Sequence, residues 1–107
     1  MQENKWNYII SSYSLNPRDV ITTPLGNRKG RWFHASVEDG KLFISKAKEH
    51  TISSRLKFRR MLNPNELKEV FDLYLKRKQG TPVSQDVLKA TINGSYWFGI
   101  FNDLDLR

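Results

Sequence analysis

The sequence contains no cysteine, and this absence excludes several kinds of site. Disulfide bonds, thiolate zinc sites and cysteine nucleophiles all require that residue. A chain without disulfides also suits a reducing compartment. We therefore expect a cytoplasmic protein whose fold depends on its hydrophobic core alone.

Long apolar runs are also missing from the chain. A helix that crosses a bilayer needs roughly 20 apolar residues, whereas the apolar run near the start, residues 6–10, is short and mixed. The same run is shorter than the apolar region of a signal peptide. The sequence therefore predicts no membrane segment and no exported precursor.

Catalytic signatures are scarce, and only two histidines are present. There is no His-x-x-x-His pair, no glycine-rich phosphate loop and no Gly-x-Ser-x-Gly element. We therefore expect a non-catalytic protein that uses neither a metal nor a cofactor. The enzymatic alternative is a small metal-free nuclease in which His50, beside Glu49 and among lysines, acts as a general base.

Positive charge is what the chain has in excess, and it is unevenly distributed. The sequence has 18 Lys and Arg against 11 Asp and Glu, a net charge of +7. Residues 1–60 contain 12 basic and 5 acidic residues, whereas residues 61–107 contain six of each. A basic half beside a neutral half indicates a surface that attracts polyanions.

The length of 107 residues suits one domain, and we expect residues 1–107 to form a single unit.

The first part of the chain favours strands. Trp6, Tyr8 and Ile10 alternate as on one face of a strand over residues 5–13, and residues 19–23 indicate a short edge strand.

Two further stretches complete the predicted sheet. Residues 31–37 and 42–45 read as a hairpin, because Asp39-Gly40 supplies the positive φ angles of a tight turn. Leu56 and Phe58 alternate with basic residues, which predicts a third strand over residues 55–59.

Helix signals begin at Asn63. Asn63 suits an N-cap, Pro64 the first turn, and Glu66 lies three residues after the cap, where its carboxylate can reach back. Further cap and periodicity signals follow after Pro82 and after Gly94. The predicted fold is therefore α+β: a small antiparallel sheet over about residues 5–60, covered by two or three C-terminal helices at about 64–79, 85–91 and 95–104.

The leading functional hypothesis is nucleic-acid binding by the β-rich half through phosphate contacts. Trp32 and Phe33 are adjacent and point to opposite faces of a strand, so one of them is either exposed, where it can stack on a base, or covered by a helix. DNA and RNA remain equally open. The predicted contact residues are Arg28, Lys29, Arg31, Trp32, Lys46, Lys48, Arg55, Lys57, Arg59 and Arg60.

The alternative function is a protein-interaction module that binds an acidic partner on the basic face or uses the last, aromatic segment. In that segment Tyr96, Trp97 and Phe101 are the predicted interface, and a homodimer is one expected use of it. A DNA-reading helix-turn-helix is a weaker interpretation: Ala90 and Gly94 have the small-residue spacing, but the second helix lacks basic residues at its start.

In general character, a small, cysteine-free, basic α+β chain resembles the accessory proteins of bacteria, phages and mobile elements. This resemblance rests on composition, and it implies an accessory or regulatory role.

Overall fold

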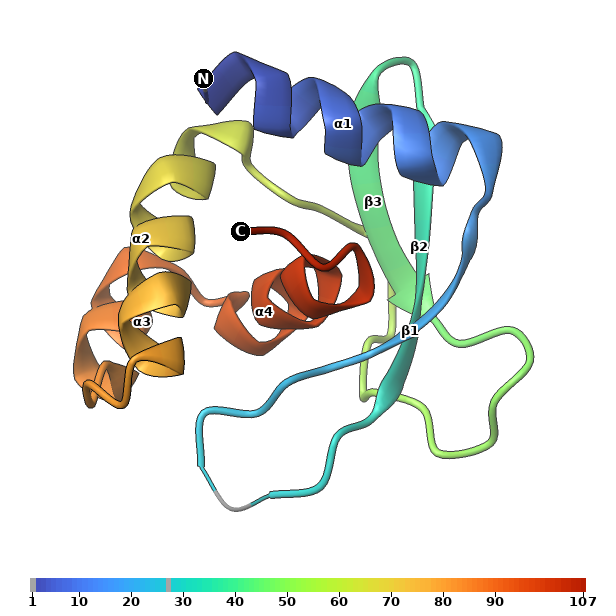
Figure 1. The fold of residues 1–107 in the computed structure, drawn as a ribbon. Helices are drawn as coiled ribbons and strands as arrows, with labels where there is room; N and C mark the ends of the chain where they lie inside the picture. The colour runs from blue at the N-terminus through green and yellow to red at the C-terminus, as the bar shows by residue number, and fades with distance from the viewer. Residues whose placement is uncertain (1, 27) are drawn as a thin grey trace.

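The computed structural model describes residues 2–26 and 28–107, and the described residues have the α+β fold that the sequence predicts. Its elements follow one another along the chain (Figure 1) as α1 (Gln2–Leu15), β1 (Arg18–Ile21), β2 (Trp32–Glu38), β3 (Lys41–Lys46), β4 (Arg60–Met61), the 3₁₀ turn η1 (Pro64–Glu66), α2 (Leu67–Lys78), α3 (Ser84–Ala90) and α4 (Gly94–Asp103).

The four strands form one antiparallel sheet in the order β1-β2-β3-β4. The predicted hairpin is confirmed: Glu38 pairs with Lys41, and the turn between them places Asp39 at φ 53° and Gly40 at φ 70°. The predicted edge strand is confirmed as β1. The hydrogen bonds of the sheet therefore connect neighbours in sequence. The β2–β3 connection is a tight turn, whereas long loops join β1 to β2 and β3 to β4.

The core lies between one face of the sheet and the helices. Phe33 and Ile44 project from the strands into it, and Trp97, Phe98 and Phe101 meet them from α4, all fully buried. Figure 1 shows α1 and α4 in front of the same face of the sheet. Helices α1 and α4 contact the sheet, whereas α2 packs on α1 and α4, and α3 packs on α2.

The strand expected over residues 5–13 was a wrong prediction, because this segment lies within helix α1. Trp6, Ile9, Ile10 and Tyr13 also follow the i, i+3, i+4, i+7 spacing of a helix. Ile9 and Tyr13 are fully buried, and the other two pack against the core. Tertiary packing of this stripe outweighs the β propensity of its aromatic and β-branched residues.

The strand predicted over residues 55–59 is also wrong, because only Arg60–Met61 joins the sheet, as β4. Leu56 is buried, but Phe58 is 83% exposed, so the two do not share a face. Arg59 instead places its guanidinium 3.8 Å from the centre of the Phe43 ring and 2.7 Å from the carboxylate of Glu38. The segment follows the sheet surface through side-chain contacts rather than a strand ladder.

The predicted C-terminal helices are confirmed, but one cap differs. Asn63 accepts a hydrogen bond from the Asn65 N–H at 3.0 Å, as an N-cap does. Glu66 does not reach back toward the cap. Its carboxylate accepts hydrogen bonds from the Thr91 hydroxyl at 2.7 Å and the Trp97 indole at 3.1 Å, which ties the start of α2 to the α3–α4 connection.

Helix α4 is almost entirely a core element. Trp97, Phe98, Ile100 and Phe101 are fully buried, so Trp97 and Phe101 of the predicted interface are core side chains, and only Tyr96 of that set reaches the surface. A recognition helix needs an exposed face to enter a DNA groove. Helix α4, the second helix of the α3–α4 pair, has no such face over residues 97–101, which are all buried. None of the helices in the described part of the chain combines the length and apolarity needed to cross a bilayer.

Candidate anion-binding groove

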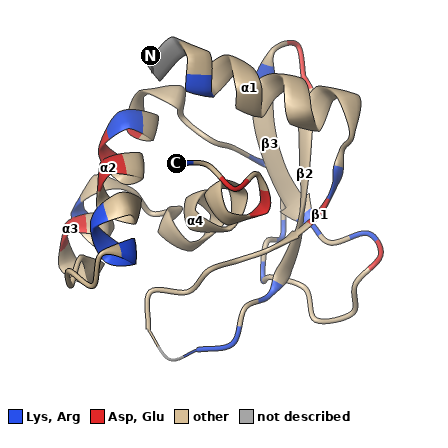
Figure 2. Cartoon of the chain, viewed as in Figure 1, with Lys and Arg blue, Asp and Glu red and all other residues tan. Residues whose placement is uncertain are grey.

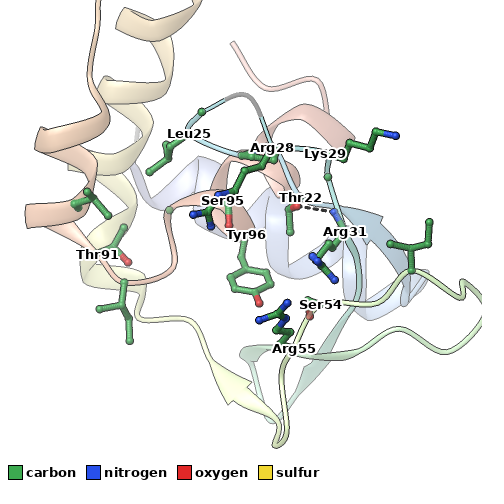
Figure 3. Close-up of a pocket in the computed structure, with 17 residues that line it drawn as sticks. Thr22, Leu25, Arg28, Lys29, Arg31, Ser54, Arg55, Thr91, Ser95 and Tyr96 are labelled. Carbon is green, nitrogen blue, oxygen red and sulfur yellow. Dashed lines mark hydrogen bonds between the residues drawn. The ribbon is translucent and has the colours of Figure 1, made fainter.

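An open groove of about 1120 Å³ lies between the loop that follows β1 and the start of α4 (Figure 3). Its described walls come from three parts of the chain that are far apart in the sequence: residues 22–26 and 28–31, residues 52–55, and residues 88–96 from the end of α3 to the start of α4. The groove is therefore a product of the tertiary fold, and no single stretch of sequence contains it.

The charge of the groove is entirely positive among its described lining residues. Arg28, Lys29, Arg31 and Arg55 line it, and all four are exposed, whereas none of the described lining residues is Asp or Glu. In Figure 3, the guanidinium groups of Arg31 and Arg55 lie on the side of the groove where Tyr96 projects, whereas the amine of Lys29 points away from the groove. Such a surface attracts anions. A wholly apolar ligand would bury these charges without pairing them, which costs free energy.

Hydroxyl and backbone donors supplement the charges. Ser54 lines the groove and is 7% exposed, and its Oγ has no hydrogen-bond partner within the described residues. Gly94 and Ser95, the first residues of α4, also line the groove, so the positive end of the helix dipole faces it. Phosphate oxygens are the acceptors that guanidinium groups, hydroxyls and helix N-termini share.

Hydrogen bonds from β1 fix the base of the loop. The Thr22 N–H donates to the Arg31 carbonyl at 2.9 Å, and the Arg31 N–H donates to the Thr22 hydroxyl at 2.9 Å. The Thr23 N–H donates to the Ser95 carbonyl at 3.1 Å. One wall of the groove is thereby attached to the helix that forms the other.

Two helices hold the same loop from the outside. Arg77 of α2 donates to the Pro24 carbonyl at 2.7 Å, and the Ser84 hydroxyl at the start of α3 donates to the Leu25 carbonyl at 3.1 Å. Arg77 was not a candidate functional residue from the sequence. In the structure it positions the loop that carries Arg28 and Arg31.

The opposite wall depends on Asp19, whose side chain is 2% exposed. Its carboxylate accepts hydrogen bonds from the backbone N–H groups of Lys48 at 3.0 Å, Glu49 at 2.8 Å and His50 at 3.1 Å. The Nδ1 atoms of His50 and His34 donate to it at 2.9 and 3.1 Å. One carboxylate of β1 thus attaches the loop after β3 to the sheet.

Trp32 packs on this loop from the sheet. Its ring stacks on the His50 ring at a centroid distance of 3.5 Å and an interplanar angle of 11°. The backbone N–H of Trp32 donates to the Ile52 carbonyl, and the backbone N–H of Ser54 donates to the Trp32 carbonyl, both at 2.8 Å. Of the adjacent aromatic pair, Phe33 faces the helices, whereas Trp32 is covered by the loop rather than by a helix.

The ionisation of Asp19 is strongly favoured. Burial by itself raises the pKa of the carboxyl group, but hydrogen bonds from the Lys48 N–H, the His50 ring, the Glu49 N–H and the His34 ring outweigh it and hold the pKa well below its usual range. The loop is therefore fixed by a charged acceptor.

Acid should weaken the folded state through this group. Because its pKa is lower in the folded than in the unfolded chain, the ionised carboxylate contributes stability above about pH 5, and this contribution is lost progressively as the pH falls below that value. Urea unfolding at roughly pH 6 and pH 3 measures it. Asp19→Asn should remove this part of the pH dependence, and an equal dependence in wild type and variant would contradict the assignment.

The structure brings four of the ten predicted contact residues together and disperses the others. Figure 2 shows basic segments on the loop after β1, whereas α2 carries both signs. Lys46, Lys48 and Lys57 are exposed outside the groove lining. Arg60 is part-buried and donates to the Asn93 side chain at 2.6 Å, so it connects β4 to the residue before α4.

Sequence patterns did not indicate the remaining groove residues. Ser54, Ile52, Leu88 and Ile92 line it without belonging to any motif, and Tyr96 was expected at a protein interface. The three aliphatic residues differ from other aliphatic residues only in being exposed, and exposure cannot be read from a single sequence.

In comparisons with protein-family models, curated proteins and solved structures, no match to this chain was found. Its function is therefore inferred from the geometry of the groove.

Proposed function

We propose that the protein binds nucleic acid, and that the groove lined by residues from the segments 22–26, 28–31, 52–55 and 88–96 contacts the phosphate backbone. The observation that carries this proposal is the presence of three guanidinium groups, those of Arg28, Arg31 and Arg55, on one groove that has no acidic residue among its described lining residues. Affinity then comes mainly from phosphate neutralisation and the release of counterions, a mechanism that requires no catalytic residue.

The start of α4 supports the same ligand chemistry. Its first residues, Gly94 and Ser95, line the groove beside the cations, and the donors of a helix N-terminus position a phosphate without reading sequence. Arg55 and Arg31 come from different walls, so a backbone that lies in the groove would contact both sides of it. DNA and RNA present the same phosphate to these groups, and the titration below separates them.

The experiment is a fluorescence-anisotropy titration of labelled single- and double-stranded DNA and RNA over a salt series of roughly 50 to 200 mM. The triple variant Arg28→Ala, Arg31→Ala, Arg55→Ala should bind more weakly. Because three phosphate contacts are lost, the slope of log K against log salt should fall by about 2 for single strands and by about 3 for duplex DNA. Thermal unfolding should leave the variant's stability close to wild type, since all three side chains are exposed.

A matched control removes the same number of charges elsewhere. Lys41, Lys68 and Lys76 are exposed and do not line the groove. The triple alanine variant of these lysines should retain most of the affinity and nearly the full salt slope. Equal losses in the two triple variants would mean that net charge, rather than the groove, attracts the ligand.

The alternative function, a protein-interaction module, has two candidate surfaces. The aromatic side of α4 is buried within the core, apart from Tyr96. The basic groove is the surface that remains for an acidic partner. The absence of any nucleic-acid binding at low salt would favour this alternative over phosphate recognition.

A further inference from the structure

The rim of the groove is apolar, in contrast to its charged walls. Ile52, Leu88 and Ile92 line the groove with 64%, 61% and 82% of their surface exposed. Ile52 comes from the loop after β3, whereas Leu88 and Ile92 come from the end of α3 and the residues after it. Single exposed aliphatic residues are ordinary on a protein surface, but their convergence from two walls on one cationic groove indicates a ligand with apolar and anionic parts.

Tyr96 adds an aromatic side chain to this surface. Its ring lies edge-on to the buried Phe33 ring, with a centroid distance of 5.1 Å and an interplanar angle of 90°. Figure 3 shows the ring projecting between the start of α4 and Arg55. A ring held by the core in this way presents a pre-ordered surface for stacking, and it costs little side-chain entropy when a base packs on it.

We infer that the groove takes a single-stranded nucleic acid, with phosphates at Arg28, Arg31 and Arg55 and bases against Tyr96 and the aliphatic rim. This inference rests on the proposed function. In a duplex the bases are stacked inside and the charged backbone faces outward, so the aliphatic rim would be buried against phosphates and sugars. A single strand exposes the apolar faces of its bases, which pack on aromatic and aliphatic side chains.

The spread of the cations favours a strand over a single nucleotide. The groove is open to solvent and has a volume of about 1120 Å³. The cations come from residues 28–31 on one wall and residue 55 on the other, so they are spread over the groove rather than gathered around one phosphate. Several linked nucleotides satisfy this arrangement better than one.

The test compares labelled oligo-dT and oligo-U of roughly 12 nucleotides, a length within the site sizes of single-strand binders, with mixed-sequence duplexes of the same length. We expect the single strands to bind about tenfold tighter than the duplexes. The variant Leu88→Ser, Ile92→Ser should lose about fivefold to tenfold in single-strand affinity while its salt slope stays at the wild-type value, because no phosphate contact is removed.

The control variant is Leu15→Ser, Phe58→Ser, which changes two exposed apolar residues outside the groove. It should bind single strands as the wild type does. Duplex affinity equal to or above single-strand affinity, or an unaltered affinity in the rim variant, would overturn the inference and leave phosphate binding by the groove intact.

Two other results reject the inference together with the proposed function. One is the lack of binding to any oligonucleotide at low salt. The other is tight binding of a labelled peptide of alternating Glu and Leu that the rim variant weakens while oligonucleotides fail to compete. That second result would assign the groove to an acidic protein segment.

Discussion

Replacement of Asp19 by alanine is expected to destabilise the protein by about 3 kcal/mol, because it removes an almost fully buried acceptor of five hydrogen bonds. For a chain of this size, such a loss should lower the melting temperature by roughly 15 °C. Water can solvate part of the freed backbone at Lys48 and Glu49, which are exposed, and this limits the loss. Urea unfolding followed by tryptophan fluorescence measures the change.

The effect of Asp19→Ala should be local as well as global. Hydrogen exchange in residues 47–55 should accelerate more than exchange in α2, because the carboxylate holds the loop and not the helical layer. Asp72→Ala, which changes an exposed aspartate of α2, is the control and should alter stability by less than about 0.5 kcal/mol. Wild-type stability in Asp19→Ala would show that stacking of His50 on Trp32 and the backbone contacts of Trp32 suffice to hold the loop.

The second large effect is expected at Gly99, where α4 crosses β1. A Cβ built there lies 2.5 Å from the Ile21 carbonyl oxygen and 3.1 Å from the Thr22 Cα, both backbone atoms. Alanine normally stabilises a helix by about 1 kcal/mol over glycine, but overpacking a filled core costs about 1–3 kcal/mol. Since backbone yields less readily than a side chain, we expect Gly99→Ala to destabilise by about 2 kcal/mol net.

Gly99→Ala should also weaken oligonucleotide binding, because displacement of α4 from β1 moves the two walls of the groove apart. Gly26→Ala is the matched control: the same substitution adds a Cβ with nothing within 4 Å, on an exposed part of the groove loop. Thermal unfolding of both variants separates the two cases. Similar melting temperatures for Gly99→Ala and wild type would mean that α4 and β1 adjust without cost.

Local signals predicted the elements that depend on local chemistry. Asp39-Gly40 was sufficient for the hairpin, and Asn63-Pro64 with the following apolar spacing was sufficient for α2. The first helix was missed because Trp6 and Ile10 fit both the period of a strand and the spacing of a helix, and only packing against the rest of the chain decides between the two.

The candidate site was less predictable than the fold for a related reason. Arg28 and Arg55 are as basic as Lys46 and Lys57, and nothing in their immediate neighbours distinguishes the residues that line the groove from those that do not. Asp19 was assigned to a short strand with no role, since its partners lie between 15 and 31 residues away. Contacts over such separations appear only when the chain is folded.

The hydrogen bonds that attach the groove loop to α2 and α3 determine how binding free energy is used. Pro24 and Leu25 are already held by Arg77 and Ser84 in the unliganded protein. A loop that becomes ordered only on association loses conformational entropy at that moment, about 0.5–1.5 kcal/mol for each immobilised side chain. At these attachment points the conformational entropy has already been lost when the protein folds. A strand entering the groove should therefore associate without waiting for this part of the wall to form, and variants that release Arg77 should slow association more than they speed dissociation.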